Sequence, residues 1–199
     1  MLPNSLRNLI DCFKMLPGIG EKTAERLVFS MLNFDKKNLS NFSDAILEVR
    51  DKITFCSLCG NISDSDICSV CSSNDRDFST VFVVEKPKDI ILFENIGAYK
   101  GVYHVLNGLI SPLDGIGPDD INIDKLLSRI SDDSRIKEVI LALKPSIEGE
   151  TTMQYIRKVL ADKNVNVSKI ATGVPIGTDI EYIDSLTLEL AIEERKNMN

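Results

Sequence analysis

Residues 56–71 read CSLCGNISDSDICSVC and hold four of the five cysteines of the chain. Cys56 and Cys59 form one Cys-x-x-Cys pair, and Cys68 and Cys71 form a second pair after a gap of eight residues. A structural zinc ion takes four ligands in a tetrahedron, and each pair can place two thiolates on one side of the ion. The stretch therefore predicts one structural zinc ion per chain, with no coordination position left for a catalytic water. A fortuitous cluster of free thiols is the alternative interpretation.

The cysteine stretch also marks a change in the pattern of the chain. Before it the sequence predicts short helices, and after it predicted strands alternate with helices. This alternation favours an α/β fold with a mostly parallel sheet covered by helices. The expected strands are 80–84, 101–106, 138–143 and 166–171. The expected helices are 5–16, 21–33, 43–53, 88–96, 122–132, 150–162 and 185–196. The fifth cysteine, Cys12, is expected to be a small core residue of the first helix.

Composition places the chain among globular cytoplasmic proteins. Of its 199 residues 43% are hydrophobic, which is enough for a core. No apolar run reaches the length of about 18 to 20 residues that a membrane helix needs. The N-terminal stretch is interrupted by Arg7, Asp11 and Lys14, which is not typical of a secretory signal. We therefore expect a cytoplasmic protein without membrane contact, where metal binding is favoured over disulfides.

The charge of the chain is unevenly distributed. The formal net charge is −7, which argues against binding of nucleic acid over the whole surface. Residues 1–52 hold eight Lys or Arg and seven Asp or Glu, whereas the remainder carries a net charge of −8. A DNA-binding role therefore has to be local, or shared among assembled subunits.

The stretch LeuProGlyIleGlyGluLysThrAlaGluArgLeu at 16–27 predicts a contact with DNA. Gly18 and Gly20 permit a tight hairpin and let backbone N–H groups approach a phosphate closely. The N-terminus of the following helix favours an anion at the same place. Lys22 and Arg26 are four residues apart, so both can meet one phosphate backbone.

The same helix has an apolar face opposite these two cations. The apolar stripe at helical spacing consists of Ala24, Leu27, Val28 and Met31. This arrangement resembles the helix-hairpin-helix, a sequence-independent DNA-binding motif. The alternative is an ordinary helical hairpin with a solvated face, in which Glu21 and Glu25 pair with the lysine and arginine.

Acidic residues follow two of the predicted parallel strands. Glu85 follows the first strand, and Glu148 and Glu150 end the stretch LeuAlaLeuLysProSerIleGluGlyGlu at 141–150. Sites in open α/β sheets gather at the carboxyl ends of the strands. The arrangement resembles the Toprim domain of topoisomerases and primases. In that domain a glutamate, an Asp-x-Asp pair and a Glu-Gly-Glu stretch hold magnesium.

Lys144 and Ser146 occupy the Asp-x-Asp positions of this resemblance. Magnesium prefers carboxylate oxygens, and an ammonium group places positive charge where the metal would bind. We therefore expect phosphoryl-transfer chemistry to be absent or badly weakened, and assign no catalytic residue. A magnesium-dependent Toprim nuclease or topoisomerase-like enzyme is the alternative. Glu150 can also be a solvated loop residue.

The order of these modules resembles that of the RecR family of bacterial recombination mediators. The resemblance covers nearly the whole chain, and its most specific stretches are 16–26, the cysteine spacing, 109–121 and 173–184. It implies a helix-hairpin-helix region at 1–54 and a four-cysteine zinc finger at 55–79. A Toprim domain at 80–175 and a C-terminal assembly segment at 176–199 complete the expected organisation.

The resemblance implies a non-enzymatic clamp in DNA repair. Family members assemble as ring-like homotetramers, which bind double-stranded DNA and single/double-strand junctions. Together with a RecO-type protein, and in some cases a RecF-type protein, they load the recombinase on gapped DNA. Lys22 and Arg26 would line the ring, and the Toprim acids, Glu148 especially, would face the RecO-type partner. The segment at 173–177 and the final helix would join subunits. A scaffold that binds no DNA is a further hypothesis.

Overall fold

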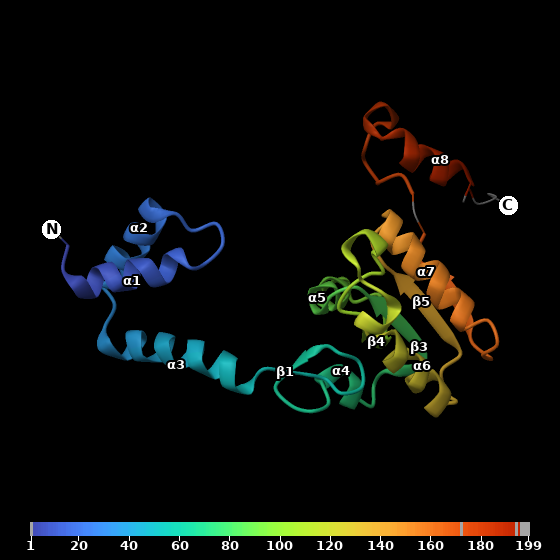
Figure 1. Ribbon diagram of the computed structural model, residues 1–199, viewed down its shortest axis with the longest axis horizontal. Helices are drawn as coiled ribbons and strands as arrows, with labels where there is room; N and C mark the ends of the chain where they lie inside the picture. The colour runs from blue at the N-terminus through green and yellow to red at the C-terminus, as the bar shows by residue number, and fades with distance from the viewer. Residues whose placement is uncertain (1, 172, 194, 196–199) are drawn as a thin grey trace. The chain divides into compact units, whose positions relative to one another are not determined.

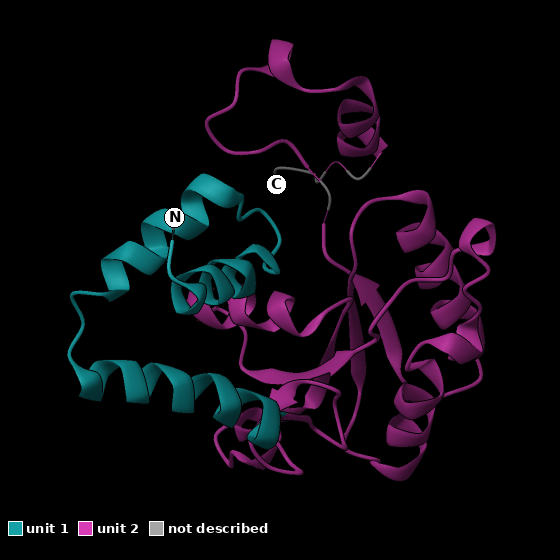
Figure 2. Ribbon diagram, turned by 60° about the vertical axis from the view of Figure 1, so that its left-hand side comes forward, with its two compact units in different colours: residues 1–53 teal, residues 54–199 magenta. Residues whose placement is uncertain are grey.

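The structure is a computed structural model that describes residues 2–171, 173–193 and 195 (Figure 1). The chain divides into two compact units, residues 1–53 and residues 54–199 (Figure 2). In the described part of the chain, no helix is both long enough and apolar enough to cross a membrane.

The first unit is built around a small core between two helices. Helices α1 (Asn4–Lys14) and α2 (Glu21–Met31) pack through Ile10, Ala24 and Val28, all of which are buried. Of the predicted apolar stripe of α2, Ala24 and Val28 are therefore confirmed as core residues, whereas Leu27 and Met31 are half-buried. The prediction for Cys12 is wrong, because its side chain is exposed. Cys12 lies two positions after the buried Ile10, and residues at that spacing do not share a helix face.

Helix α3 (Lys36–Lys52) begins seven residues before the position that the sequence predicted. The side chain of Asp35 accepts a hydrogen bond of 2.7 Å from the Asn38 backbone N–H, which caps the helix at this earlier start. No residue of α3 is buried. Its exposed apolar side chains include Leu39, Phe42, Ile46, Leu47 and Val49.

The second unit is centred on a four-stranded parallel sheet. Its strands β3 (Asp77–Val84), β4 (Gly101–Val105), β5 (Glu138–Ala142) and β6 (Asn166–Lys169) are arranged in the order β4-β3-β5-β6. The two central strands therefore pair with each other, and β6 lies at an edge. The parallel sheet that the sequence predicted is confirmed.

Both faces of this sheet are covered. Helices α6 (Ile123–Asp132) and α7 (Ile147–Val159) pack on one face, against side chains such as Val83 and Leu141. Helix α5 (Pro87–Ile96) and the four clustered cysteines pack with Phe82 and Val84 of the other face. The alternation of side chains along β3 explains why one strand contributes to both cores.

The cysteine stretch forms short elements of its own. Strands β1 (Thr54–Phe55) and β2 (Ile62–Ser63) pair antiparallel, and helix α4 (Ser69–Ser72) follows. After the sheet, the described chain continues through the 3-10 turn η3 (Ile180–Tyr182) to helix α8 (Ser185–Glu193). The part of the predicted last helix at 194 and 196 lies outside the described residues.

Candidate metal centre and nucleic-acid interface

The four clustered cysteines converge on one point. The sulfur atoms of Cys56, Cys59, Cys68 and Cys71 lie within 4.8 Å of one another, and all four residues are buried. The Sγ atoms of Cys59 and Cys68 are 3.6 Å apart. Four sulfurs at about 2.3 Å from a tetrahedral zinc ion lie about 3.8 Å from one another. The geometry therefore fits a structural zinc with four thiolate ligands.

Backbone N–H groups stabilise the negative charge that thiolate ligands carry. The N–H of Asn61 points to the Cys59 sulfur at 3.4 Å, and the N–H of Cys68 points to the Cys56 sulfur at 3.3 Å. The turn between the first two ligands is closed by the N–H of Gly60, which donates to the carbonyl of Cys56 at 2.9 Å. Gly60 has a φ of +75°, which explains why glycine follows the first pair.

Without a metal, the pKa values of Cys59 and Cys68 shift in opposite directions. Hydrogen bonds from Cys59 and Cys71 lower the pKa of Cys68. The neighbouring Cys68 and Cys71 raise the pKa of Cys59, and burial raises it further. The thiolate of Cys68 is thus stabilised, whereas that of Cys59 is disfavoured. A divalent cation removes this conflict, because it favours the deprotonated form of each ligand.

The zinc loop is fixed to the parallel sheet. The backbone N–H of Val105, at the end of β4, donates to the carbonyl of Cys59 at 2.7 Å. The carbonyl of Val105 in turn accepts a bond of 3.1 Å from the Asn122 side-chain amide. A methyl group at Gly60 would lie 3.2 Å from the Val105 carbonyl oxygen, so the loop and the strand are closely packed. The sequence carried no signal for this contact.

The predicted hairpin is present between α1 and α2. Gly18 has a φ of +80°, and Gly20 is the residue that precedes the first turn of α2. A Cβ at either glycine would meet nothing within 4 Å, so their backbones are open to an approaching ligand. Lys22 and Arg26 are exposed on α2, whereas Ala24 between them is buried. Both cations thus lie on the solvent side of the helix.

In the described part of the chain, the acidic neighbours form no ion pair with these two cations. Glu21 contacts Lys14 at 2.5 Å, and Glu21 and Asp11 together raise the pKa of that lysine. Among the ion pairs of residues 2–171, 173–193 and 195, none involves Lys22 or Arg26. The interpretation in which Glu21 or Glu25 pairs with them therefore has no support in the structure.

Glu85 and the loop after β5 lie at the point where the strand order reverses. The end of β3 at Val84 is in register with Ala142 of β5, so both stretches leave neighbouring strands at the same edge of the sheet. Glu85 is half-buried, and its carboxylate lies 3.2 Å from the ammonium group of Lys86.

Glu148 and Glu150 lie in the first turn of α7, not before it. The helix begins three residues earlier than predicted, because the Ser146 side chain accepts a hydrogen bond from the Gly149 N–H at 3.2 Å. The Ser146 hydroxyl also donates to the Glu148 carboxylate at 2.7 Å. This bond, with the charge of Lys144, lowers the pKa of Glu148.

Gly149 allows this tight start of the helix. A Cβ at this position would lie 2.0 Å from the backbone oxygen of Lys144. The glycine between the two glutamates is therefore required by the close approach of two backbone segments. Its role was not visible in the sequence.

Glu150 does not share the environment of Glu148. Residues two positions apart point to different sides of a helix. The Glu150 carboxylate lies 3.9 Å from the ammonium group of Lys169 at the end of β6. The three predicted acids thus divide into Glu85 and Glu148 at the switch point and Glu150 beside the edge strand.

The second unit combines a buried site of four cysteines with a Toprim-type parallel sheet, and the first unit carries a helical hairpin with two exposed cations. These features define a class of zinc-containing proteins that handle nucleic acids. Residues 6–50 match the family model described as RecR, helix-hairpin-helix, and residues 53–73 match the model of the RecR zinc finger domain with four cysteines. Residues 79–171 match the Toprim domain, and residues 173–196 match the RecR C-terminal model.

Curated relatives agree over nearly the whole chain. The recombination protein RecR of Lactobacillus helveticus is 45% identical over 193 residues, which cover 97% of each chain. That of Chloroherpeton thalassium is 46% identical over 200 residues, with 98% of each chain covered. The chain therefore belongs to the RecR family of recombination proteins. The predictions of the family, of the fold class and of one structural zinc are confirmed.

Proposed function

We propose that this chain is a non-enzymatic recombination mediator, a DNA clamp that works with a RecO-type partner to load a recombinase on gapped DNA. The observation that carries the proposal is the exposed pair Lys22 and Arg26 beside the open hairpin of Gly18 and Gly20. In this proposal the hairpin region is 1–54, the zinc finger 55–79, the Toprim domain 80–175 and the assembly segment 176–199.

The hairpin has the chemistry of a phosphate site. The N-terminus of α2 and the open glycine backbone favour an anion, and the two cations can neutralise further phosphates along one strand. These contacts address the phosphate backbone and carry no base sequence, which suits binding to double-stranded DNA and to junctions. One hairpin with a net charge near +1 binds weakly, so several copies must act together.

The assembly that we propose is a homotetrameric ring in the cytoplasm. It is supported by apolar surface that one chain leaves uncovered. Helix α3 has no buried residue, and the described residues of 173–193 have none either. Exposed apolar patches of this kind are typical of protein interfaces. Four hairpins in one ring would also bring their positive charges together at the DNA, although each chain as a whole is acidic.

The acidic switch point of the sheet is proposed as the contact for a RecO-type partner, with RecF-type proteins as further partners. Glu148 is held in place by Ser146, and Glu85 lies at the end of the adjacent strand. Lys144 is exposed, and Ser146 uses its hydroxyl to cap α7. Neither residue supplies the carboxylate that a catalytic magnesium would need. A basic partner surface suits this site better than a metal ion does.

The DNA contact is tested with a Lys22→Glu/Arg26→Glu variant and gapped DNA at physiological salt. We expect affinity to fall by at least tenfold relative to the parent chain. The matched control is Lys36→Glu/Lys37→Glu, which makes the same charge change at exposed positions of α3. Equal binding by parent and hairpin variant would refute the contact, and the absence of any salt-sensitive DNA affinity would favour a scaffold.

The non-enzymatic role is tested by incubation of the zinc-loaded protein with supercoiled and gapped DNA in the presence of magnesium. We expect no cleavage above that of a Glu85→Gln variant. Cleavage that requires magnesium and is lost in Glu85→Gln would instead establish a Toprim nuclease or topoisomerase-like enzyme.

A further inference from the structure

The loop after β4 presents a leucine to solvent. Residues 111–116 read SerProLeuAspGlyIle and lie between β4 and α6. Leu113 is 99% exposed, whereas Leu109 and Ile110 directly before the segment are buried in the core. The segment 111–116, which we call the Leu113 loop, therefore projects from a buried base.

The Leu113 loop is closed by hydrogen bonds to itself. The backbones of Ser111 and Ile116 exchange two bonds, of 2.9 and 3.0 Å. The hydroxyl of the buried Ser111 donates to the Asp114 carboxylate at 2.6 Å, and Gly115 turns the chain with a φ of +72°. The tip is thus held in one conformation, so a protein that contacts Leu113 has little additional chain to order.

The Leu113 loop belongs to the edge of the sheet that carries Glu85. The backbone N–H of Asn107 donates to the Glu85 carbonyl at 2.9 Å, and that of Ile110 donates to the Thr152 hydroxyl of α7 at 2.9 Å. Figure 1 shows this loop, in yellow-green, beside the start of α7. The loop after β4 and the acids that follow β3 and β5 therefore share the carboxyl edge of the sheet.

This edge combines exposed apolar side chains with negative charge. Ile147, the first residue of α7, is 83% exposed. The stretch 109–121 contains three aspartates and neither Lys nor Arg. Asp114 and Asp120 accept hydrogen bonds within the stretch, and Asp119 is exposed. The edge is therefore both more apolar and more acidic than an ordinary solvated loop requires.

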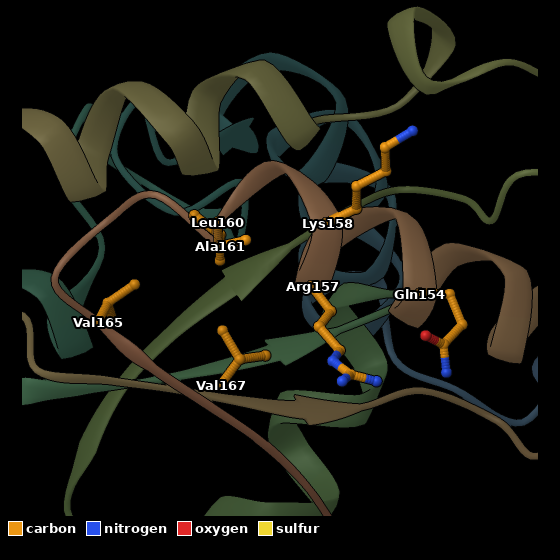
Figure 3. A pocket seen from close by; sticks show the side chains of 7 residues that line it. All are labelled: Gln154, Arg157, Lys158, Leu160, Ala161, Val165 and Val167. Carbon is orange, nitrogen blue, oxygen red and sulfur yellow. The ribbon is translucent and has the colours of Figure 1, made fainter.

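The other end of α7 has the opposite charge. Arg157 and Lys158, in the last turn of the helix, line a cavity of about 460 Å³ between α7 and the edge strand β6 (Figure 3). Cations and acids are thus separated along α7, so a charged ligand can distinguish its two ends. The carboxyl edge repels the phosphates of DNA, whereas it attracts a basic protein surface.

We propose that the Leu113 loop is the apolar anchor of a contact with a partner protein, in which Leu113 enters an apolar pocket surrounded by a basic surface. A few buried anchors carry most of the binding free energy of an interface, and charges around them guide association. Asp119 and Glu148 would pair with the basic rim. A second copy of the chain fits less well, because residues 53–199 carry a net charge of −8. This inference rests on the partner contact in the proposed function and adds an anchor that the acids do not supply.

Truncation of the leucine tests the anchor. The RecO-type protein of the same organism is titrated against the zinc-loaded chain in a calorimeter, without DNA. Leu113→Ala should weaken binding at least tenfold and leave the salt dependence of the affinity unchanged, because no charge is removed. The control is Ile96→Ala, which truncates a 69% exposed side chain at the end of α5 that leads into the start of β4. It should bind as the parent does, and unchanged binding by Leu113→Ala would overturn the proposal.

Charge reversal tests the basic rim. Asp119→Lys should weaken binding of the RecO-type protein and reduce the salt dependence of the affinity. The matched control is Asp162→Lys, which makes the same change at an exposed position beyond the basic end of α7. Equal affinities of these two variants would contradict a basic partner surface at the loop.

Photo-cross-linking locates the partner on the loop. Leu113 is replaced by p-benzoylphenylalanine, and the chain is irradiated with the RecO-type protein, with and without gapped DNA. We expect cross-linked peptides that join position 113 to an apolar segment of the RecO-type protein flanked by Lys or Arg. Cross-links only to a second copy of the chain, cross-links only to DNA, or none above background would refute the anchor.

The titrations separate this inference from the proposed function. If the parent chain does not bind the RecO-type protein, the partner contact itself fails, and the anchor fails with it. If the parent and Leu113→Ala bind equally well, only the anchor fails. Zinc content and far-ultraviolet circular dichroism of each variant confirm that the fold is intact.

Discussion

The backbone N–H of Val105 donates a 2.7 Å hydrogen bond to the carbonyl oxygen of Cys59, a zinc ligand. Val105 is itself buried in the core that contains the four cysteines and one face of the sheet. The zinc site and the Toprim sheet therefore share a core. Loss of the metal should disturb the sheet, not only the loop that binds the ion.

The first prediction concerns the zinc ligands. Cys59→Ser should lower the zinc content well below one ion per chain. It should also reduce solubility or thermal stability, because the free energy of zinc binding is also free energy of folding. Metal analysis and thermal unfolding of reduced protein measure both effects. Cys12→Ser is the matched control, since Cys12 is exposed, and it should leave zinc content and stability unchanged. Full zinc occupancy in Cys59→Ser would contradict the assignment.

The second prediction concerns the start of α7. Gly149→Ala should lower the free energy of unfolding by at least about 2 kcal/mol, because the added methyl group would lie 2.0 Å from the Lys144 backbone oxygen. Denaturant unfolding measures the change. Gly173→Ala is the control, because a Cβ there meets nothing within 4 Å. Similar stability of both variants would show that the backbones at 144 and 149 do not approach so closely.

The third prediction concerns the pH dependence of stability. His104 on β4 is buried, and its Nε2 lies 2.8 Å from the Asn122 carbonyl. Among the described residues, its Nδ1 has no hydrogen-bond partner. Burial lowers the pKa of His104 from 6.5 to about 4. The unfolded chain therefore binds a proton that the folded chain excludes. The contribution of neutral, buried His104 to the free energy of unfolding is therefore fully present above pH 6.5, and it is lost as pH falls toward 4.

Between pH 7 and pH 5 this effect should lower the free energy of unfolding by about 2 kcal/mol. His104→Gln retains a donor for the Asn122 carbonyl and removes the titration. Denaturant unfolding of both proteins at the two pH values should therefore show a smaller decrease for the variant. Acid effects on the zinc site are common to both proteins and cancel in the comparison. Equal decreases would mean that His104 is accessible to protons in the folded chain.

The fourth prediction concerns the salt dependence of DNA binding. Each phosphate neutralised by a cation contributes about −0.9 to the slope of log affinity against log salt concentration. Lys22→Ala/Arg26→Ala should therefore reduce the magnitude of that slope by about 2 for each hairpin engaged. Fluorescence anisotropy at several salt concentrations gives the slope, with Lys36→Ala/Lys37→Ala as the control. A slope that does not change would place the phosphate contacts elsewhere on the protein.

Local patterns in the sequence were sufficient for the longer helices, the strands of the parallel sheet and the metal ligands, but not for the short elements β1, β2 and α4. The Cys-x-x-Cys pairs identified the zinc site, since four thiolates at that spacing have few other uses in a small module. Alternating strands and helices predicted the parallel sheet, and the stripe of Ala24 and Val28 predicted the buried face of α2. These features depend on residues that are near one another in the chain.

Local sequence patterns did not predict where α7 starts, or that Glu148 and Glu150 lie in different environments. Ser146 can cap a helix or stay in a loop, and the outcome depends on how closely Gly149 approaches the Lys144 backbone. Glu148 and Glu150 differ by two positions, so an early helix start sends them to different environments. From the sequence alone, Glu148 and Glu150 were predicted to belong to one acidic cluster.

By itself the sequence determined the family, the zinc ligands and the two cations of the hairpin, because each depends on residue type and short-range spacing. Only the tertiary structure decided which distant residues contact each other, which are buried and which stay exposed. It joined Cys59 to Val105 across more than forty positions of the chain, buried His104 and left Arg157 beside an open strand edge. Such relationships depend on packing between distant segments, and no local pattern records them.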